Sequence, residues 1–585
     1  MLRRKLLSAF LLCAILVPTA AFAQSGAIYQ APKETIDKIK EEGMKNSQVM
    51  QTLNYLTNVI GARLTASPNM KRANEWTRDQ MTKWGMQNAK LEAWGPFGRG
   101  WELKRFSAQV NSPYAFPIIA YPKAWSPGIS IAAPQPVMNP KDKKKKMTMP
   151  MVAPSTVLTA DVVYMDAKTP TDLDKYKGQL KGKIVLMSDV REVKADFDGM
   201  GERLTDKQLL EMANSPDPAS IQRPGGGQPN NNQMQARLQR FVDGLKRAKF
   251  VIDEGAAVVV DNSFNGSGGT VFVQQASVAA DIPENPLDLF TQKRLQPWDK
   301  EAESKMIPQM TVATEDYNRL VRMIQAGEKV QMTVDLAVQY HDEDTMGYNT
   351  VAEIPGTDPT LKEEIVMLGG HMDSWHSGTG ATDNGAGVAV AMEAARIIIA
   401  SGLKPRRTIR VGLWSGEEQG LFGSSNYVKQ HFGEMKGGGN IFGIPQANQT
   451  KPELIKGADY DKLSAYYNLD NGTGKIRGVY MQGNGAVAPI FRSWLAPFVE
   501  MGAATLTMQN TGGTDHLSYD RIGLPGFQFI QDEIEYDTRT HHSNQDVFDR
   551  IQADDMKQAA TIMAAFVYQT AMMDEKMPRK VMRMN

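Results

Sequence analysis

The sequence predicts an α/β protein whose main sheet is largely parallel and covered by helices on both faces. In the second half of the chain, short apolar runs alternate with stretches long enough to be helices. Residues 365–368 form one such run, and the turn after them is rich in glycine. The nearly uncharged residues 388–400 follow that turn. Strands of parallel sheets are buried on both faces, so continuous apolar runs of this kind are what they require.

The chain before residue 113 has a mainly helical pattern. Residues 33–59 are rich in helix formers and predict one or two helices. Residues 69–84 carry apolar side chains close to helical spacing, and Gly85 stands where such a helix would end. Residues 89–94 then read as a strand.

The composition changes at about residue 113. Prolines become frequent, and short β-like runs appear at residues 160–165, 183–187 and 256–260. This pattern predicts a separate β-rich part, in which nothing looks catalytic by itself.

Polar candidates follow the apolar runs of the second half. The runs at residues 408–414, 465–468 and 526–530 are each followed by acidic or histidine residues. The carboxyl ends of parallel strands meet at one edge of a sheet, where open α/β sheets bind their ligands. We therefore expect one cluster at that edge, made of His371, Asp383, Glu417, Glu418, Asp470, His541 and His542.

This donor set predicts a metal site. Two imidazoles, one bridging carboxylate and two further carboxylates suit a pair of zinc ions about 3.5–4 Å apart. The only cysteine is Cys13. It lies within residues 1–23, which have the pattern of an export signal. The mature chain would therefore have no disulfide and no thiolate ligand.

The first residues predict export. Arg3, Arg4 and Lys5 precede an apolar stretch at residues 6–17, and Ala21-Phe22-Ala23 forms a small-x-small cleavage pattern. Residues 1–23 are therefore expected to be a Sec-type signal peptide, with an uncleaved anchor helix as the alternative. The mature protein would be periplasmic or extracellular, without a stable membrane anchor.

The overall composition is that of an ordinary soluble globular protein, with 42% hydrophobic and 22% charged residues. The net charge is +1. It gives no electrostatic reason to expect binding to nucleic acid or to a membrane surface.

The order of the motifs is similar to that of the co-catalytic zinc exopeptidases of peptidase family M28. These motifs are HMD, TDNGAG, SGEEQGLFGS, NLDN and HHSNQD, and they follow one another in that order. The resemblance implies the zinc exopeptidase fold, a three-layer sandwich with a mixed, mainly parallel sheet. It also implies two zinc ions.

The resemblance assigns roles residue by residue. His371 and Asp470 would hold one zinc, Glu418 and His542 the other, and Asp383 would bridge them. The family pattern of His, Ser or Thr, two residues and Asp fits residues 542–546, which favours His542 over His541 as the ligand.

Three further features follow from the resemblance. Glu417 would be the general base that takes a proton from a metal-bridging water. Asp373 would accept the other N–H of His371, with a turn-capping role as its alternative. The peptide bond between Asp383 and Asn384 would be cis. Asp515 and His516 match another family segment near the cleft. Two roles are open for them: contact with substrate, or a place in the core.

A second resemblance concerns the β-rich part. GKIVL at residues 182–186 and GAAVVV at residues 255–260 resemble the protease-associated domain. Together with the signal-like start, this resemblance divides the chain into four segments. Residues 1–23 are expected to be the signal peptide, and residues 116–335 an inserted protease-associated domain. Residues 24–115 and 336–585 would be the two parts of one catalytic domain.

The expected function is that of a secreted zinc exopeptidase acting on peptides, with an aminopeptidase as the first choice. A carboxypeptidase or dipeptidase of the carboxypeptidase Q type is the alternative. A glutaminyl cyclase-like acyltransferase and a non-catalytic binding protein are more remote ones. A homodimer stays open.

Overall fold

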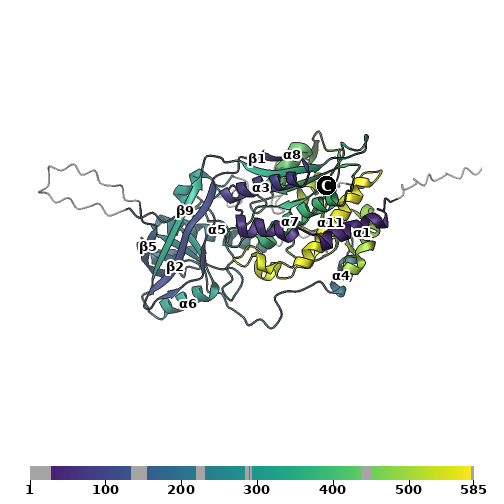
Figure 1. The fold of residues 1–585 in the computed structure, drawn as a ribbon. Helices are drawn as coiled ribbons and strands as arrows, with labels where there is room; N and C mark the ends of the chain where they lie inside the picture. The colour runs from purple at the N-terminus through teal and green to yellow at the C-terminus, as the bar shows by residue number, and fades with distance from the viewer. Residues whose placement is uncertain are drawn as a thin grey trace, which may run out of the picture.

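The structure of the protein is a computed structural model that describes residues 28–132, 154–218, 220, 231–283, 289, 293–437 and 451–581. The predicted signal peptide and Cys13 lie outside the described residues. Two eight-stranded sheets organise the chain. The larger, helix-covered part and the smaller, β-rich part lie side by side in Figure 1.

The first sheet is mixed, with a parallel centre. Along the sheet, its strands are β1 (Gln87–Trp94), β10 (Gly347–Ile354), β12 (Thr408–Trp414), β11 (Ile365–His371), β15 (Leu463–Asn468), β18 (Gly526–Gln531), β16 (Ile476–Tyr480) and β17 (Thr505–Thr507). The four central strands β12, β11, β15 and β18 are parallel to one another. The outer strands β1 and β10 are antiparallel to their neighbours, as is β16 to β18.

Helices cover both faces of this sheet, because successive side chains of a strand point to opposite faces. Val366 and Leu368 of β11 belong to one core, while Ile365 and Met367 belong to the other. The first core is covered by α1 (Lys33–Lys45), α2 (Val49–Asn54), α3 (Pro68–Lys83), α7 (Ala386–Ala400), α9 (Ala488–Leu495) and α11 (Ala553–Met572). The second core is covered by α8 (Phe422–His431) and α10 (His516–Asp520), with the short hairpin β13 (Gly433–Lys436) and β14 (Glu453–Lys456) beside α8. These layers confirm the predicted α/β class.

Helix α7 is the central helix of the first core. It is almost free of charge, and residues 386–398 are all buried. Its two charged residues neutralise each other, because the Arg396 guanidinium donates to Glu393 at 2.7 Å and to Glu42 of α1 at 2.6 Å. Burial of nearly every side chain fixes the helix, and with it the turn at its start that carries Asp383.

The second sheet has its own core. In spatial order, its strands are β3 (Phe116–Pro117), β2 (Gly100–Ser112), β9 (Gln331–His341), β5 (Val157–Tyr164), β6 (Ile184–Leu186), β7 (Val258–Asn262), β8 (Gln309–Val312) and β4 (Ala120–Pro122). Helix α6 (Thr314–Gln325) packs on this core, and α5 (Asn231–Asp253) leads into β7. The long strands β2 and β9, at the two limits of the predicted insertion, belong to this sheet. Its identity as a protease-associated domain stays a prediction.

One segment between β6 and β7 returns to the first sheet. It contains α4 (Asp206–Ala213), which lies at the far end of the larger part in Figure 1. Just before this helix, Arg203 forms ion pairs at 2.8 Å with Asp532 and Asp555. This segment of the β-rich part is therefore tied to the larger part of the structure by Arg203.

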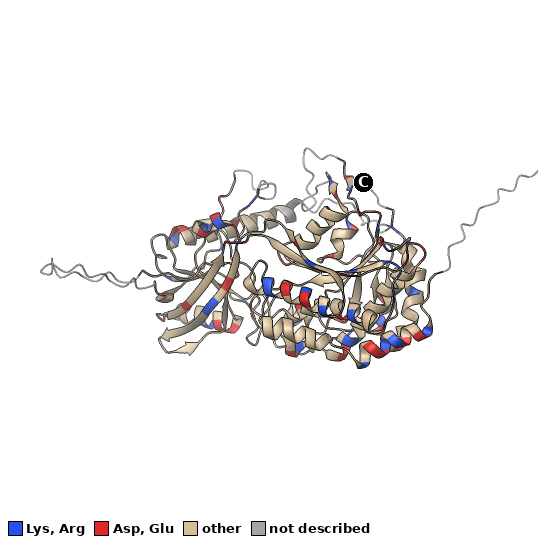
Figure 2. Cartoon of the chain, turned by 45° about the horizontal axis from the view of Figure 1, so that its top comes forward, with Lys and Arg blue, Asp and Glu red and all other residues tan. Residues whose placement is uncertain are grey.

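Lysines and arginines are interspersed with aspartates and glutamates along the chain (Figure 2). On α1, lysines alternate with acidic residues and form ion pairs one turn apart, such as Lys33 with Asp37 and Lys38 with Glu34. Among the described residues, no helix is both long enough and apolar enough to cross a membrane.

Candidate metal centre

The carboxyl ends of the central parallel strands bring the candidate residues together. His371 is the last residue of β11, Glu417 and Glu418 lie on the turn after β12, and Asp470 lies two residues after β15. Asp383 lies on the turn between β11 and α7, and its peptide bond to Asn384 is cis, as the resemblance implies.

Glycine in β11 allows the neighbouring strand to come close to this edge. A Cβ atom on Gly369 would collide with the carbonyl oxygen of Gly412 in β12. A larger residue would therefore push apart the two strands that carry His371 and the Glu417–Glu418 turn.

The side chains form two donor sets that share Asp383. In the first set, His371 Nε2 lies 3.2 Å from Asp383 Oδ1 and 3.4 Å from Asp470 Oδ1. In the second set, His542 Nε2 lies 3.1 Å from Asp383 Oδ2 and 2.9 Å from Glu418 Oε2. Each oxygen of Asp383 therefore faces a different histidine.

These distances fit zinc. Ligand atoms at about 2.0–2.2 Å from a tetrahedral zinc lie about 3.3 Å from one another, and the four histidine–carboxylate distances, 2.9, 3.1, 3.2 and 3.4 Å, are close to this value. Four side-chain atoms of these residues are buried without a hydrogen-bond partner among the described residues: His371 Nε2, Asp383 Oδ2, Asp470 Oδ1, and Oε1 of Glu418, the oxygen that does not face His542. Buried polar atoms without partners are rare, and a metal ion would supply what these four lack.

Electrostatics also favours a cation here. Burial, together with the charge of Asp383, raises the pKa of the Glu418 carboxyl to about 7. Burial acts to lower the pKa of His542, but Glu418 and Asp383 outweigh it and raise this pKa to about 11. The site thus crowds several buried carboxylates within a few ångströms, and a bound divalent cation would remove their repulsion.

Asp373 holds the turn that carries the two glutamates. Its carboxylate accepts the backbone N–H of Glu417 at 3.2 Å, that of Glu418 at 3.3 Å, and the Thr65 hydroxyl at 3.0 Å. The sequence led us to expect this carboxylate on the second nitrogen of His371. In the structure, Nδ1 of His371 lies 3.1 Å from the backbone carbonyl oxygen of Asp373 and 3.7 Å from its carboxylate. The carbonyl is closer because the carboxylate is turned toward the two N–H groups.

The two adjacent histidines differ in position. His542 Nε2 reaches Asp383 Oδ2 at 3.1 Å, whereas His541 Nε2 lies 3.8 Å from the same atom. The ring of His541 is stacked on Tyr536 with the ring centres 4.6 Å apart. The geometry therefore favours His542 as the donor and leaves His541 beside it.

Asp546 anchors the turn of Asp383. Its carboxylate accepts the backbone N–H and the hydroxyl of Thr382 at 2.5 and 2.9 Å, and the N–H of Asp383 at 3.2 Å. In the sequence, Asp546 ends the motif that begins at His542, and this fixed spacing is the one signal for its role.

Arg63 is a structural residue of the site that sequence reasoning missed. Its side chain is completely buried, and burial lowers its pKa to about 10, so it is still charged at neutral pH. The guanidinium donates to the backbone carbonyls of Leu56, Gly61, Met372, Thr379 and Gly380. It thereby fixes the loop between His371 and Asp383 against the N-terminal helices.

Replacing Arg63 by leucine is expected to lower the free energy of unfolding by about 3–5 kcal/mol, because it leaves several buried carbonyls without donors. Urea unfolding would measure this. The control is Arg72→Ala, which removes an exposed side chain with one hydrogen bond to Val59 and should cost less than about 1 kcal/mol. Equal losses for the two variants would contradict the anchoring role of Arg63.

His516 lies in the core. It is fully buried, and its Nε2 contacts the backbone carbonyl of Thr511 at 3.2 Å. Burial lowers its pKa to about 4. Of the two roles left open by the sequence, the core role fits these contacts better.

This burial predicts an acid-sensitive contribution to stability. Between pH 6.5 and 4 the unfolded chain binds a proton at residue 516 that the folded chain does not, so stability falls as the pH falls through this window. The loss would be about 3 kcal/mol. His516→Gln keeps a donor for Thr511 but cannot be protonated, so urea unfolding in the presence of a chelator should depend less steeply on pH. An unchanged slope would show that His516 does not contribute.

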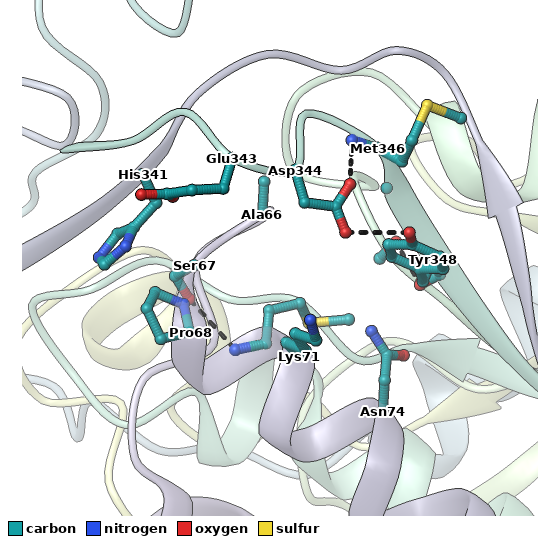
Figure 3. A pocket seen from close by; sticks show the side chains of 13 residues that line it. Ala66, Ser67, Pro68, Lys71, Asn74, His341, Glu343, Asp344, Met346 and Tyr348 are labelled. Carbon is teal, nitrogen blue, oxygen red and sulfur yellow. Dashed lines mark hydrogen bonds between the residues drawn. The ribbon is translucent and has the colours of Figure 1, made fainter.

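A separate pocket lies near the start of α3 (Figure 3). Its volume is about 200 Å³, and its wall includes Lys71, Asn74, Glu343, Asp344 and Tyr348. None of the candidate metal donors lines it, so it is separate from the candidate metal centre.

Part of the chain is similar in sequence to known proteins. Residues 349–567 match the model of peptidase family M28. The chain is 31% identical to carboxypeptidase Q of Mus musculus over 273 residues, which is 47% of this chain and 52% of the relative. For carboxypeptidase Q of Xenopus laevis the identity is 30% over 318 residues, 54% of this chain and 61% of the relative. The chain thus spans about half the length of the curated relatives it matches.

Two solved structures share the fold. The crystal structure of a peptidase M28 precursor from Shewanella amazonensis SB2B has a TM-score of 0.59 at 21% identity, over 94% of this chain and 99% of that one. A zinc aminopeptidase from Bacillus subtilis has a TM-score of 0.50 at 18% identity, over 90% of this chain and 96% of that one.

All five candidate metal donors lie within the matched residues. The part of the chain that contains these donors, residues 349–567, is therefore the part that is similar to peptidase family M28.

Proposed function

We propose that the protein is a di-zinc exopeptidase that removes residues from the amino end of peptides. The observation that carries this proposal is the pair of donor sets, in which the two oxygens of Asp383 face His371 and His542 separately. Two zinc ions fit such a set, and the names of the M28 relatives include aminopeptidases and carboxypeptidases.

Glu417 is the proposed general base. Its Oε2 lies 3.9 Å from His371 Nε2, farther than the carboxylates of Asp383 and Asp470. It is thus near the metal site without being one of its closest donors. Bound zinc would polarise the scissile carbonyl and lower the pKa of the attacking water. The Glu417 carboxylate would take the proton from that water and later deliver it to the leaving amine.

The charges beside His542 favour a substrate amine over a carboxylate. The loop before it carries Glu533, Glu535 and Asp537, and its one arginine, Arg539, already pairs with Glu535 at 3.2 Å. Within the described part of the chain, Glu533 and Asp537 form no ion pair. This surplus of negative charge would attract the free amino terminus of a peptide. Carboxypeptidase Q-type activity is the second candidate, favoured by the curated relatives of that name.

The test is hydrolysis of two blocked dipeptides by the zinc-loaded protein. One dipeptide is acetylated at its amino end, and the other is amidated at its carboxyl end. An aminopeptidase cleaves only the amidated peptide, which has a free amine. Cleavage of the acetylated peptide alone would overturn the proposal in favour of a carboxypeptidase. If both blocked peptides resist but the free dipeptide is cleaved, the protein is a dipeptidase.

We also propose that the protein is exported and cleaved after Ala23, on the strength of the signal-like pattern in residues 1–23. The mass of the protein recovered from the periplasm or the medium should then correspond to a chain that starts at Gln24. Residues 116–335 are proposed as an inserted protease-associated domain. A monomer and a homodimer remain alternatives.

A further inference from the structure

A segment from the β-rich part of the chain docks directly on the loop that carries His542. This segment follows β7 and spans residues 269–274. Its backbone pairs with the His542 loop, because Val273 N–H donates to the carbonyl of His542 at 3.2 Å and Asn544 N–H donates to the carbonyl of Val271 at 3.1 Å. The Asn544 side chain adds two bonds, accepting from Val271 N–H at 2.8 Å and donating to the Gly269 carbonyl at 3.2 Å.

The docking fixes an unusual backbone. His542 has a φ of +65°, in the left-handed region that residues other than glycine rarely adopt. The hydrogen bonds to the His542 carbonyl and to Asn544 hold the loop in that shape. The β-rich part therefore supports the geometry of a metal donor that belongs to the other sheet.

The segment also reaches the imidazole ring of His542. The side-chain amide nitrogen of Gln274, Nε2, lies 2.9 Å from Nδ1. The other ring nitrogen, Nε2, is the one that faces Asp383 and Glu418. Gln274 thus contacts the only ring nitrogen that a metal at this site would leave free.

The chemistry of imidazole decides which end of the amide is needed. If Nε2 binds a metal, its lone pair is used, so the ring proton must be on Nδ1 and requires an acceptor. The amide oxygen of Gln274 is such an acceptor. The oxygen and nitrogen of an amide exchange places by a half-turn, so the same side-chain position can present either atom to Nδ1.

The other histidine donor supports this requirement. Nδ1 of His371 lies 3.1 Å from the backbone carbonyl oxygen of Asp373, an atom that can only accept. In that case the acceptor comes from the same loop as the histidine. For His542 it comes from a residue 268 positions away in the sequence.

We propose that Gln274 is a positioning residue for the metal centre. Its amide oxygen accepts the Nδ1 proton of His542, which fixes the ring and directs the Nε2 lone pair at the metal. The second zinc site is then complete only when the segment at 269–274 is docked. This inference rests on the proposed role of His542 as a zinc ligand.

The test compares zinc binding in four proteins: wild type, Gln274→Leu, Gln274→Glu and Gln275→Leu. Gln274 is exposed, so its replacement should leave the fold intact, and Gln274→Glu retains an acceptor oxygen. Gln275 is the matched control, an exposed neighbour whose side chain forms no hydrogen bond with the described residues. Competition with a chromogenic chelator would give the affinity of each zinc ion.

Gln274→Leu is expected to lower the affinity for one of the two zinc ions by about 10–100-fold. This is the usual effect of losing the outer partner of a metal-bound histidine. Gln274→Glu should restore most of that affinity, and Gln275→Leu should bind zinc as the wild type does. The value of kcat for a dipeptide should fall with zinc occupancy, with KM little changed.

Two results would overturn the inference. If Gln274→Leu binds both ions as tightly as the wild type, Gln274 does not position His542, while the di-zinc proposal stands. If His542→Ala also keeps both ions, His542 is not a ligand, and the inference falls together with that part of the proposed function.

Discussion

Replacing Glu417 by glutamine is expected to reduce kcat for peptide hydrolysis by about 10²–10⁴-fold, the usual contribution of a general base. The amide has nearly the same shape as the carboxylate but cannot take a proton. Because Glu417 lies farther from His371 Nε2 than Asp383 and Asp470 do, zinc content should stay at the wild-type level. Metal analysis and kcat would be measured on the same preparation.

The neighbouring residue provides the control. Glu418 Oε2 lies 2.9 Å from His542 Nε2, so Glu418→Gln should weaken zinc binding as well as activity. Retention of more than a few per cent of activity by Glu417→Gln would show that another group is the base. Loss of zinc by this variant would instead make Glu417 a ligand.

The place where the candidate metal donors gather could be predicted because it depends on local patterns. Apolar runs identify the strands, parallel strands place their carboxyl ends at one edge, and His371, Glu418 and Asp470 each follow such a run. No knowledge of distant contacts is needed for this step. The same reasoning predicted the helices on both faces of the sheet.

The supporting contacts could not be predicted, because they join residues that are far apart in the sequence. Arg63 has its role only because the loop at Met372–Gly380 folds over it, and Gln274 only because its segment docks beside His542. An arginine in a turn-rich stretch and a glutamine after a strand are common, and no local pattern marks either one.

Asp373 shows an intermediate case. Its closeness in sequence to His371 suggests a place beside the candidate site. The sequence does not show whether its carboxylate or its backbone carbonyl lies closer to the His371 ring. The choice depends on the turn after β12, whose N–H groups attract the carboxylate. Local sequence gives the position of such a residue, and the tertiary fold decides which of its atoms is used.

Asp383→Asn is expected to weaken the binding of both zinc ions together. Asp383 Oδ1 lies 3.2 Å from His371 Nε2, and Oδ2 lies 3.1 Å from His542 Nε2, so one carboxylate serves both donor sets. Asparagine offers one oxygen and an NH₂ group that cannot bind a metal, and it removes the negative charge that both ions share. We expect each affinity to fall by at least about 100-fold, the upper end of what losing an outer partner costs, and activity to be lost with the metal.

Asp470→Asn provides the contrast, because Asp470 faces only His371. This variant should lose one ion and keep the other. Titration of both metal-free variants with zinc, followed by metal analysis, separates the two patterns. If Asp383→Asn kept one zinc at full occupancy, the carboxylate would belong to a single ion, and the two donor sets would be independent sites that only happen to lie side by side.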